Sequence, residues 1–138
     1  PTGELRSVKG TAFDFTEGKK IGKDIGADDE QLIMCRGYDH NFCVNGEAGK
    51  LRTVAKVTDA KSGRKLEVMS DLPGVQLYTG NFLDGTKAGK GGIPMIQHAG
   101  FCLETQFYPD TPHHPEFPSC LYKAGEKYVS ETVYEFSL

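Results

Sequence analysis

The chain has 138 residues and a formal net charge of −3, with 38% hydrophobic and 25% charged residues. No apolar run approaches the roughly 18 residues that a membrane-spanning helix needs, and eight Phe and six Tyr can supply a hydrophobic core. The slightly acidic balance offers no basic field for a phosphate backbone, so we expect no membrane and no nucleic acid as partners.

The first third of the chain has little periodicity. Seventeen Gly and seven Pro indicate many turns and short segments, and we expect residues 1–50 to be mostly irregular. The acidic run at 28–30 precedes the apolar residues 32–34, a pattern that favours the N-terminus of one short helix. A short helix and an irregular segment are both open alternatives here.

From residue 51 the pattern changes to that of strands. Residues 51–58 are rich in β-formers, residues 64–70 alternate polar and apolar, and the loop between them contains Gly63. This arrangement predicts an antiparallel hairpin with one solvated face. Residues 75–79 predict another short strand after the Pro73-Gly74 turn.

The last third mixes strands with long loops. Residues 84–92 (DGTKAGKGG) have the composition of an exposed loop, and residues 100–106 predict a strand. Four prolines between 109 and 118 exclude helix and ladder alike, and residues 128–138 alternate as a closing strand does. The chain as a whole therefore predicts an all-β fold, with residues 1–138 as a single unit.

The cysteines and histidines indicate no metal or redox site. The cysteines form no C-x-x-C pair, and with no leader sequence visible we expect reduced thiols in a cytoplasmic protein. The histidines lack the spacing of zinc ligands. The G-x-x-x-x-G segment at 80–85 is followed by Thr86-Lys87, the reverse of the phosphate-loop order. We therefore expect no metal and no cofactor.

Polar residues inside apolar strands are the candidates for function. Glu104 and Gln76 each lie among apolar neighbours, where an unpaired polar group is costly to bury. Alternation alone places Glu104 on the solvated face of its strand. Asp39 lies in a segment flanked by aromatics, Tyr38 and Phe42. That combination suits a sugar site, but an Asx turn explains it equally well.

Three segments resemble the aldose 1-epimerases, or galactose mutarotases: residues 37–42 (GYDHNF), 73–82 (PGVQLYTGNF) and 100–106 (GFCLETQ). Residues 1–4, 9–11, 109–110, 117–118 and 128–138 also resemble that family, in order along the whole chain. The resemblance implies the C-terminal portion of a galactose-mutarotase-like antiparallel β-supersandwich. It also implies interconversion of the α and β anomers of free aldohexoses such as galactose or glucose, without a cofactor.

The resemblance assigns roles to four residues. Glu104 matches the general base of the family, and a partly desolvated carboxylate would suit that role. Asp39 matches a residue that holds sugar hydroxyls, Gln76 matches a position lining the same pocket, and Tyr78 is added because it lies two positions further along the same strand.

The family's catalytic histidine pair and a substrate-binding arginine belong to a preceding part of the enzyme, and His40, His98, His113 and His114 do not match that pair. Because the chain also begins at Pro1 rather than Met, we expect a fragment. Its expected partner is the missing N-terminal part, and the isolated chain is expected to be inactive. The alternatives are a non-catalytic carbohydrate-binding fragment and the structural half of a split or truncated enzyme.

Overall fold

A computed structural model describes residues 2–138. The chain divides into two compact units, the first formed by residues 2–3, 41–76 and 103–138, and the second by residues 4–40 and 77–102. The expectation that residues 1–138 form a single unit stays a prediction.

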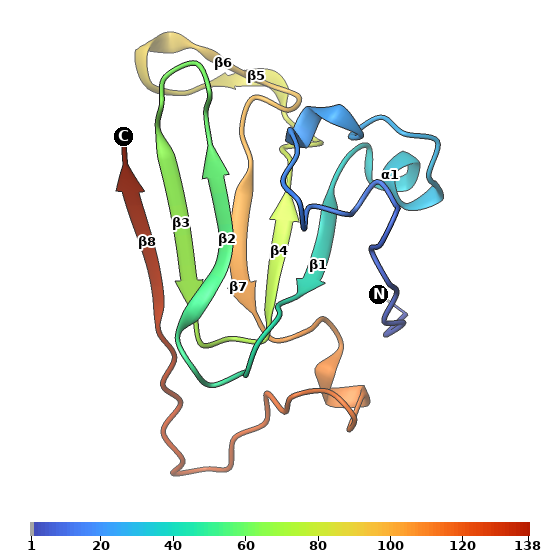
Figure 1. Ribbon diagram of the computed structural model, residues 1–138, viewed down its shortest axis with the longest axis vertical. Coiled ribbons are helices and arrows are strands. Elements are labelled where there is room, and N and C mark those ends of the chain that lie inside the picture. The colour runs from blue at the N-terminus through green and yellow to red at the C-terminus, as the bar shows by residue number, and fades with distance from the viewer. Residues whose placement is uncertain (1) are drawn as a thin grey trace. The chain divides into compact units, whose positions relative to one another are not determined.

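The first unit contains the predicted hairpin. Strand β2 (Arg52–Thr58) pairs antiparallel with β3 (Lys65–Ser70), and β3 pairs antiparallel with β8 (Thr132–Ser137). Figure 1 shows these three strands side by side, with β3 between the other two. The hairpin loop closes where the Asp59 carboxylate accepts hydrogen bonds from the backbone and hydroxyl of Ser62. The closing strand is confirmed but is shorter than expected.

Alternation gives this sheet one apolar face. Val68 pairs with Tyr134, and Leu66 pairs with Phe136, so these side chains lie on the same side. Val68 is fully buried, whereas Phe136 at the edge strand is 76% exposed. On the opposite face Lys56 forms an ion pair with Glu67 across β2 and β3. The prediction of a hairpin with one solvated face is thus confirmed.

A second sheet has the order β1-β4-β7, with β4 in the middle. Its strands are β1 (Asp39–Cys43), β4 (Gly74–Tyr78) and β7 (Cys102–Gln106). The sequence predicted β4 and β7 but not β1. Three of the five residues of β1 are polar (Asp39, His40 and Asn41), and such a segment does not have the composition of a strand. Val75 and Leu77 of β4 are almost fully buried, which explains why the middle strand is the most apolar.

In the second unit, the expected short helix follows the acidic run at 28–30. Helix α1 (Glu30–Cys35) begins after Asp29, whose carboxylate accepts a hydrogen bond of 2.9 Å from the backbone of Gln31. It ends at Arg36, which has a φ of 57°. Leu32 is the buried residue of the helix. A 3-10 turn, η1 (Ile21–Lys23), precedes it.

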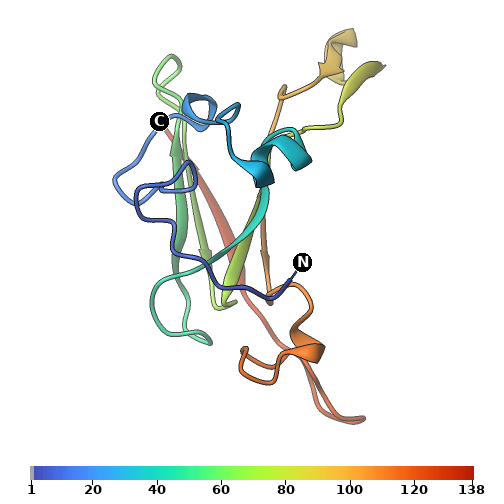
Figure 2. The same ribbon diagram turned by 90° about the vertical axis from the view of Figure 1, so that its right-hand side faces the viewer.

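A hairpin replaces part of the expected loop at 84–92. Strand β5 (Asp84–Ala88) pairs antiparallel with β6 (Pro94–Ile96), and η2 (Lys90–Gly92) joins them. Figure 2 shows this hairpin, in yellow, standing apart from α1. The residues are largely exposed, as expected, but the loop assignment is wrong for Asp84–Ala88. The glycine-rich composition of this segment indicates turns. It does not reveal that β6 pairs with β5, and this pairing makes the segment a strand.

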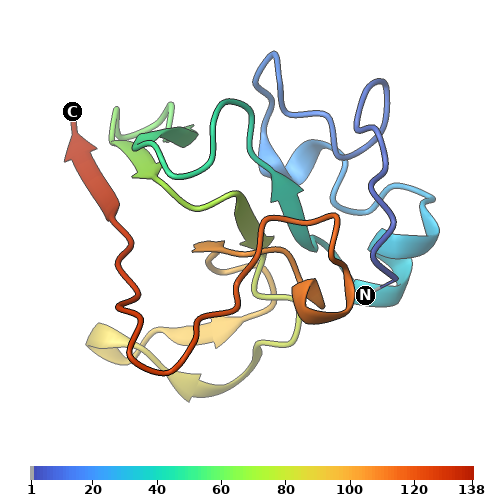
Figure 3. The same cartoon turned by 90° about the horizontal axis from the view of Figure 1, so that it is seen from below.

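The segment between β7 and β8 is long and mostly irregular, and Figure 3 shows it, in orange and red, as an open arc of the first unit. One 3-10 turn, η3 (Thr111–His113), interrupts it. Pro112 lies in the first turn, where its missing N–H is not needed, so the expectation that the prolines exclude every helix is wrong at this point. Within residues 2–138 no helix has the length and apolar character to cross a membrane.

The sheets confirm the all-β prediction, and the pairs β2–β3, β3–β8 and β5–β6 are antiparallel.

Candidate functional site

A row of three side-chain amides crosses the first unit. The Nε2 atom of Gln106, on β7, donates hydrogen bonds to Oδ1 of Asn41 on β1 at 3.1 Å and to Oε1 of Gln76 on β4 at 3.3 Å. All three side chains are half-buried. Gln76, which was predicted from the sequence, therefore belongs to a hydrogen-bonded row with two residues that were not.

Glycine on the middle strand makes this row possible. Gly74 lies two residues before Gln76, so the two residues present the same face of β4. A Cβ on Gly74 would overlap the Oδ1 atom of Asn41. Because Gly74 has no side chain, side chains from β1 and β7 can meet above the strand that separates them.

Glu104 lies beside this row. It is two residues before Gln106 on β7 and therefore shares its face. Its side chain is exposed, while Leu103 and Thr105 on either side are half-buried. The outward orientation expected from alternation is found. Among residues 2–138, the neighbours of Glu104 leave its side chain exposed and do not provide the partial desolvation expected of a general base.

Two hydrogen bonds from the β8 segment hold β7 around Glu104. The hydroxyl of Tyr134 donates to the backbone oxygen of Leu103 at 2.8 Å, and the hydroxyls of Thr105 and Thr132 lie 2.7 Å apart. The residues that precede and follow Glu104 are thus fixed to another strand. An exposed carboxylate on a fixed backbone can be directed at a ligand without an ordering cost of its main chain.

In the second unit, a buried tyrosine precedes Asp39. The side chain of Tyr38 is fully buried, and its hydroxyl donates to the backbone oxygen of Ala12 at 2.7 Å. The rings of Phe13 and Phe15 contact it edge-on. Burial raises the pKa of Tyr38 to about 12, with Asp24 and Asp29 adding to the effect, so the phenol stays neutral.

Buried polar side chains also fix the backbone at Tyr38. The Nδ2 atom of Asn81 donates to its carbonyl oxygen at 2.9 Å, and its N–H donates to the hydroxyl of Thr79 at 3.0 Å. That hydroxyl donates to Oδ1 of Asn81 at 2.6 Å. Thr79 and Asn81 are each 2% exposed. This network determines where β1 begins and therefore how Asp39 enters the strand.

His40 is held as a neutral imidazole beside Asp39. Its Nδ1 accepts a hydrogen bond of 3.0 Å from the backbone N–H of Asp39, and its ring contacts Phe13 edge-on. Burial lowers the pKa of His40, an effect that Asp39 and Asp29 oppose. Its Nε2 is buried without a hydrogen-bond partner among the described residues.

The structure distributes the four predicted site residues over both units. Gln76 and Glu104 lie in the first unit, and Asp39 and Tyr78 lie in the second. Tyr78 is half-buried, and its hydroxyl accepts a hydrogen bond of 3.4 Å from the backbone of Phe82. Gln76 is linked to the side chains of Asn41 and Gln106 within its unit. The functional roles of all four stay predictions.

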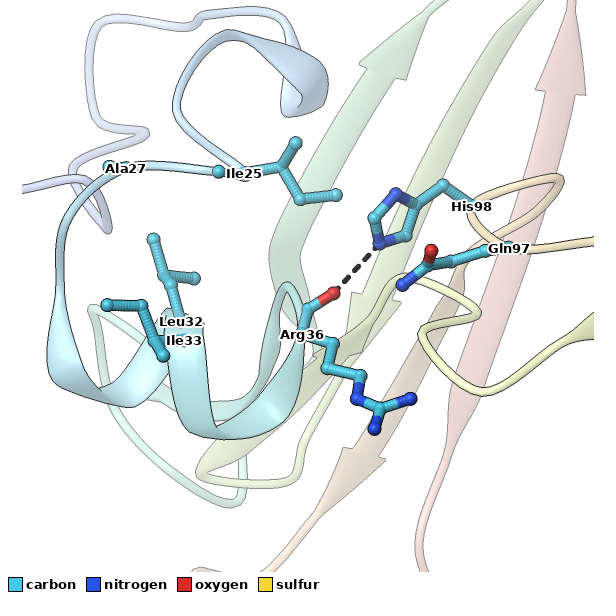
Figure 4. Close-up of a pocket in the computed structure, with 8 residues that line it drawn as sticks. Ile25, Ala27, Leu32, Ile33, Arg36, Gln97 and His98 are labelled. Atoms are coloured by element: carbon cyan, nitrogen blue, oxygen red, sulfur yellow. Dashed lines mark hydrogen bonds between the residues drawn. The ribbon is translucent and has the colours of Figure 1, made fainter.

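The pocket beside α1 is not lined by Asp39, Gln76, Tyr78 or Glu104. The pocket, about 250 Å³ in volume, lies in the second unit (Figure 4) and is lined mainly by apolar residues of α1 and the preceding loop. His98 lines it and forms a hydrogen bond of 2.9 Å between its Nε2 and the backbone oxygen of Arg36. Within residues 2–138, no group of three or more His, Cys, Asp or Glu side chains is arranged to hold a metal ion.

Sequence reasoning missed Asn41, Gln106 and Gly74. Each lies in a segment that the sequence had already marked, and Gln106 has the same parity as Glu104. The sequence predicted a turn at Gly74, whereas the structure makes it the first residue of β4. A glycine in a strand often marks a close approach of other atoms, so the turn assignment concealed this signal. The pairing of Asn41 with Gln106 required the strand order.

Comparison of the chain with known proteins identifies its family. A sequence profile described as aldose 1-epimerase matches residues 1–135. The chain is 50% identical over all 138 residues to galactose mutarotase of Bos taurus, and 40% identical over 138 residues to aldose 1-epimerase of Escherichia coli. These alignments cover 100% and 99% of this chain but 39% of each relative, so the chain spans about two-fifths of their length.

A solved structure agrees with the sequence matches. The crystal structure of an aldose epimerase homologue from C. elegans superimposes with a TM-score of 0.81 at 31% identity, covering 99% of this chain and 40% of that chain. The fold expected from the resemblance, a portion of a galactose-mutarotase-like β structure, is confirmed. The chain therefore belongs to the aldose 1-epimerase family.

Proposed function

We propose that the protein containing this chain interconverts the α and β anomers of a free aldohexose such as galactose or glucose. The observation that carries this proposal is the 50% identity to galactose mutarotase of Bos taurus, which extends over the whole chain. The chain itself spans 39% of that relative, so the activity is proposed for the complete protein rather than for this segment.

Glu104 is the proposed general base. Its carboxylate takes the proton of the anomeric hydroxyl, the bond between the anomeric carbon and the ring oxygen breaks, and an acid protonates the ring oxygen. Rotation of the aldehyde followed by ring closure on its other face, with both proton transfers reversed, gives the other anomer. The acid is proposed to be a histidine contributed by the part of the protein outside this chain. That part is also the proposed partner that would desolvate Glu104.

Asp39, Gln76 and Tyr78 are the proposed sugar contacts. A carboxylate accepts hydrogen bonds from sugar hydroxyls, an amide both donates and accepts, and a tyrosine offers a hydroxyl and an aromatic face. The half-buried amide row around Gln76 supports this role, because it presents neutral polar groups beside Glu104 on the same sheet.

Polarimetry of freshly dissolved α-D-galactose tests the proposal. The full-length protein should accelerate mutarotation in proportion to its concentration, and α-D-glucose should be tested alongside. The 138-residue chain alone should match buffer, because it lacks the proposed acid. A full-length protein that binds galactose without accelerating mutarotation would instead make this a carbohydrate-binding protein.

A further inference from the structure

Two hydroxyl groups of β8 hold the strand that carries Glu104. Strand β7 lies at the end of the order β1-β4-β7, so within residues 2–138 β4 is the one strand paired with it in a ladder. An edge strand leaves one row of its backbone groups without a ladder partner. On β8, the hydroxyl of Tyr134 donates to the backbone oxygen of Leu103 at 2.8 Å. The hydroxyl of Thr132, also on β8, lies 2.7 Å from that of Thr105.

These two bonds restrain the backbone on both sides of Glu104. A peptide group is planar, so a bond to the oxygen of Leu103 also fixes the plane that contains the nitrogen of Glu104. Thr105 is β-branched and therefore restricted in χ1, so a bond to its hydroxyl restrains its backbone as well. The carboxylate of Glu104 consequently moves mainly through the torsions of its own side chain.

The restraint on β7 extends into the core of the other sheet. Thr132 and Ser70 pair in the register of β8 and β3, and their hydroxyls lie 3.1 Å apart. Ser70 is fully buried, and its hydroxyl donates to the backbone oxygen of Glu131 at 3.3 Å. Each hydroxyl has one proton, so Thr132 must donate to Ser70, and Thr105 must donate to Thr132. The chain of hydroxyls thus runs from β7 to a residue that no solvent reaches.

We propose that Tyr134 and Thr132 are positioning residues for Glu104: through β7 they direct the carboxylate of the proposed general base at the anomeric hydroxyl. This inference rests on the proposed function. The hydroxyl of Tyr134 uses its one proton on the oxygen of Leu103. The side chain of Thr105, which Thr132 contacts, lies on the face of β7 opposite to Glu104. Both residues therefore act through Glu104 and not on the sugar.

Steady-state kinetics of the full-length protein tests this role. Tyr134→Phe keeps the ring but removes the hydroxyl, so kcat for galactose should fall about tenfold, the effect of about one lost hydrogen bond that holds the base in place. KM should stay within about twofold, because Tyr134 makes no proposed sugar contact. Tyr122→Phe is the matched control, since Tyr122 and Tyr134 are each 48% exposed, and it should leave both constants unchanged.

Two substitutions at Thr132 separate positioning from a general structural role. Thr132→Val keeps the shape of the side chain but removes the hydroxyl, so it should lower kcat about tenfold with KM unchanged. Thr132→Ser keeps the hydroxyl and loses a methyl group, so it should keep the wild-type kcat even where its thermal midpoint falls. A structural role would lower the midpoint of both variants and leave kcat per folded molecule unchanged. Should Thr132→Val fail to fold, Tyr134→Phe, at an exposed position, decides alone.

The outcomes distinguish this inference from the proposed function. An active wild-type protein in which Tyr134→Phe keeps the wild-type kcat, or raises KM instead, overturns the positioning role alone. Equal losses of kcat in Thr132→Ser and Thr132→Val overturn it too, because the hydroxyl would then not matter. A wild-type protein without mutarotase activity overturns the proposed function and, with it, the positioning role.

Discussion

The amide oxygen of Asn41 lies closer to the position of a Cβ atom on Gly74 than van der Waals contact allows. Asn41 belongs to β1 and Gly74 to the adjacent strand β4, so a side chain of the outer strand occupies the space above the middle one. This close approach favours glycine at position 74, because an added Cβ would force the Asn41 amide out of its place. The reason is packing and not backbone conformation, since Gly74 does not have a left-handed φ.

Gly74→Ala should therefore destabilise the full-length protein, by about 1–3 kcal/mol as for other overpacked sites. Urea unfolding measures this change. Gly22→Ala is the matched control, because a Cβ there meets no atom within 4 Å and the backbone is not left-handed. Asn41→Ala should remove most of the cost of Gly74→Ala in the double variant. An equal cost in both backgrounds would mean that Asn41 is not the obstacle.

Asn81 should be a sensitive position of the second unit. Asn81→Asp removes the donor to the Tyr38 carbonyl and brings a carboxylate oxygen toward it, so we expect a loss of stability of about 1–3 kcal/mol or more. Thermal unfolding of the full-length protein gives the readout. Asn45→Asp, the same change at an exposed residue, should have little effect. Equal midpoints for the two variants would contradict the importance of the network.

Strand periodicity predicted the elements in which polar and apolar residues alternate. The predicted strands at residues 51–58 and 64–70 contain β2 and β3, which pair antiparallel as expected. Strands β1 and β5 were not predicted, because their segments are polar or contain glycine. Such segments form strands when neighbouring strands pair with them, and a local sequence pattern does not show those neighbours.

The residues of the candidate site also differ in how far the sequence identified them. Glu104 and Gln76 were identified because a polar residue among apolar neighbours is visible in the sequence, and the family resemblance gave them roles. Asn41 and Gln106 gained their significance only from the order β1-β4-β7, which brings residues 65 positions apart into hydrogen-bond contact. No local signal carries that information.

Glu104→Gln should abolish most of the activity of the full-length protein while galactose binding survives. The amide keeps the size of the side chain but cannot take a proton, and general bases typically contribute about 10²–10⁴-fold. Polarimetry gives the rate, and calorimetric titration with galactose gives the affinity. Glu135→Gln, at an exposed glutamate of β8, should keep full activity. Turnover of Glu104→Gln at the wild-type rate would remove Glu104 from the mechanism.

Asp39→Asn should mainly raise KM. The substitution keeps the shape of the side chain but removes the charge that strengthens hydrogen bonds to sugar hydroxyls, so about a tenfold increase is expected. Asp59→Asn is the control: it removes a carboxylate from the hairpin loop between β2 and β3, which is not a proposed sugar contact, and it should leave KM unchanged. Unchanged KM and kcat in Asp39→Asn would dismiss its role in substrate binding.

His40 should make stability depend on pH on the acidic side of neutrality. Burial lowers its pKa in the folded state below the ordinary value of 6.5, so the unfolded chain binds the proton more readily. The contribution of the neutral imidazole is fully present above pH 6.5 and is lost as the pH falls from there through the lowered pKa. Thermal midpoints of the full-length protein between pH 7.5 and about 5 measure it.

Two variants isolate this dependence. His40→Asn keeps an acceptor for the Asp39 N–H but cannot titrate, so it should flatten the acidic loss of stability. His113 has the opposite sign: its hydrogen bond to Asp110 raises its pKa, so its stabilising contribution is present at low pH and is lost as the pH rises through that raised value. His113→Asn should therefore retain the acidic loss. An acidic loss that persists unchanged in His40→Asn would assign it to another group.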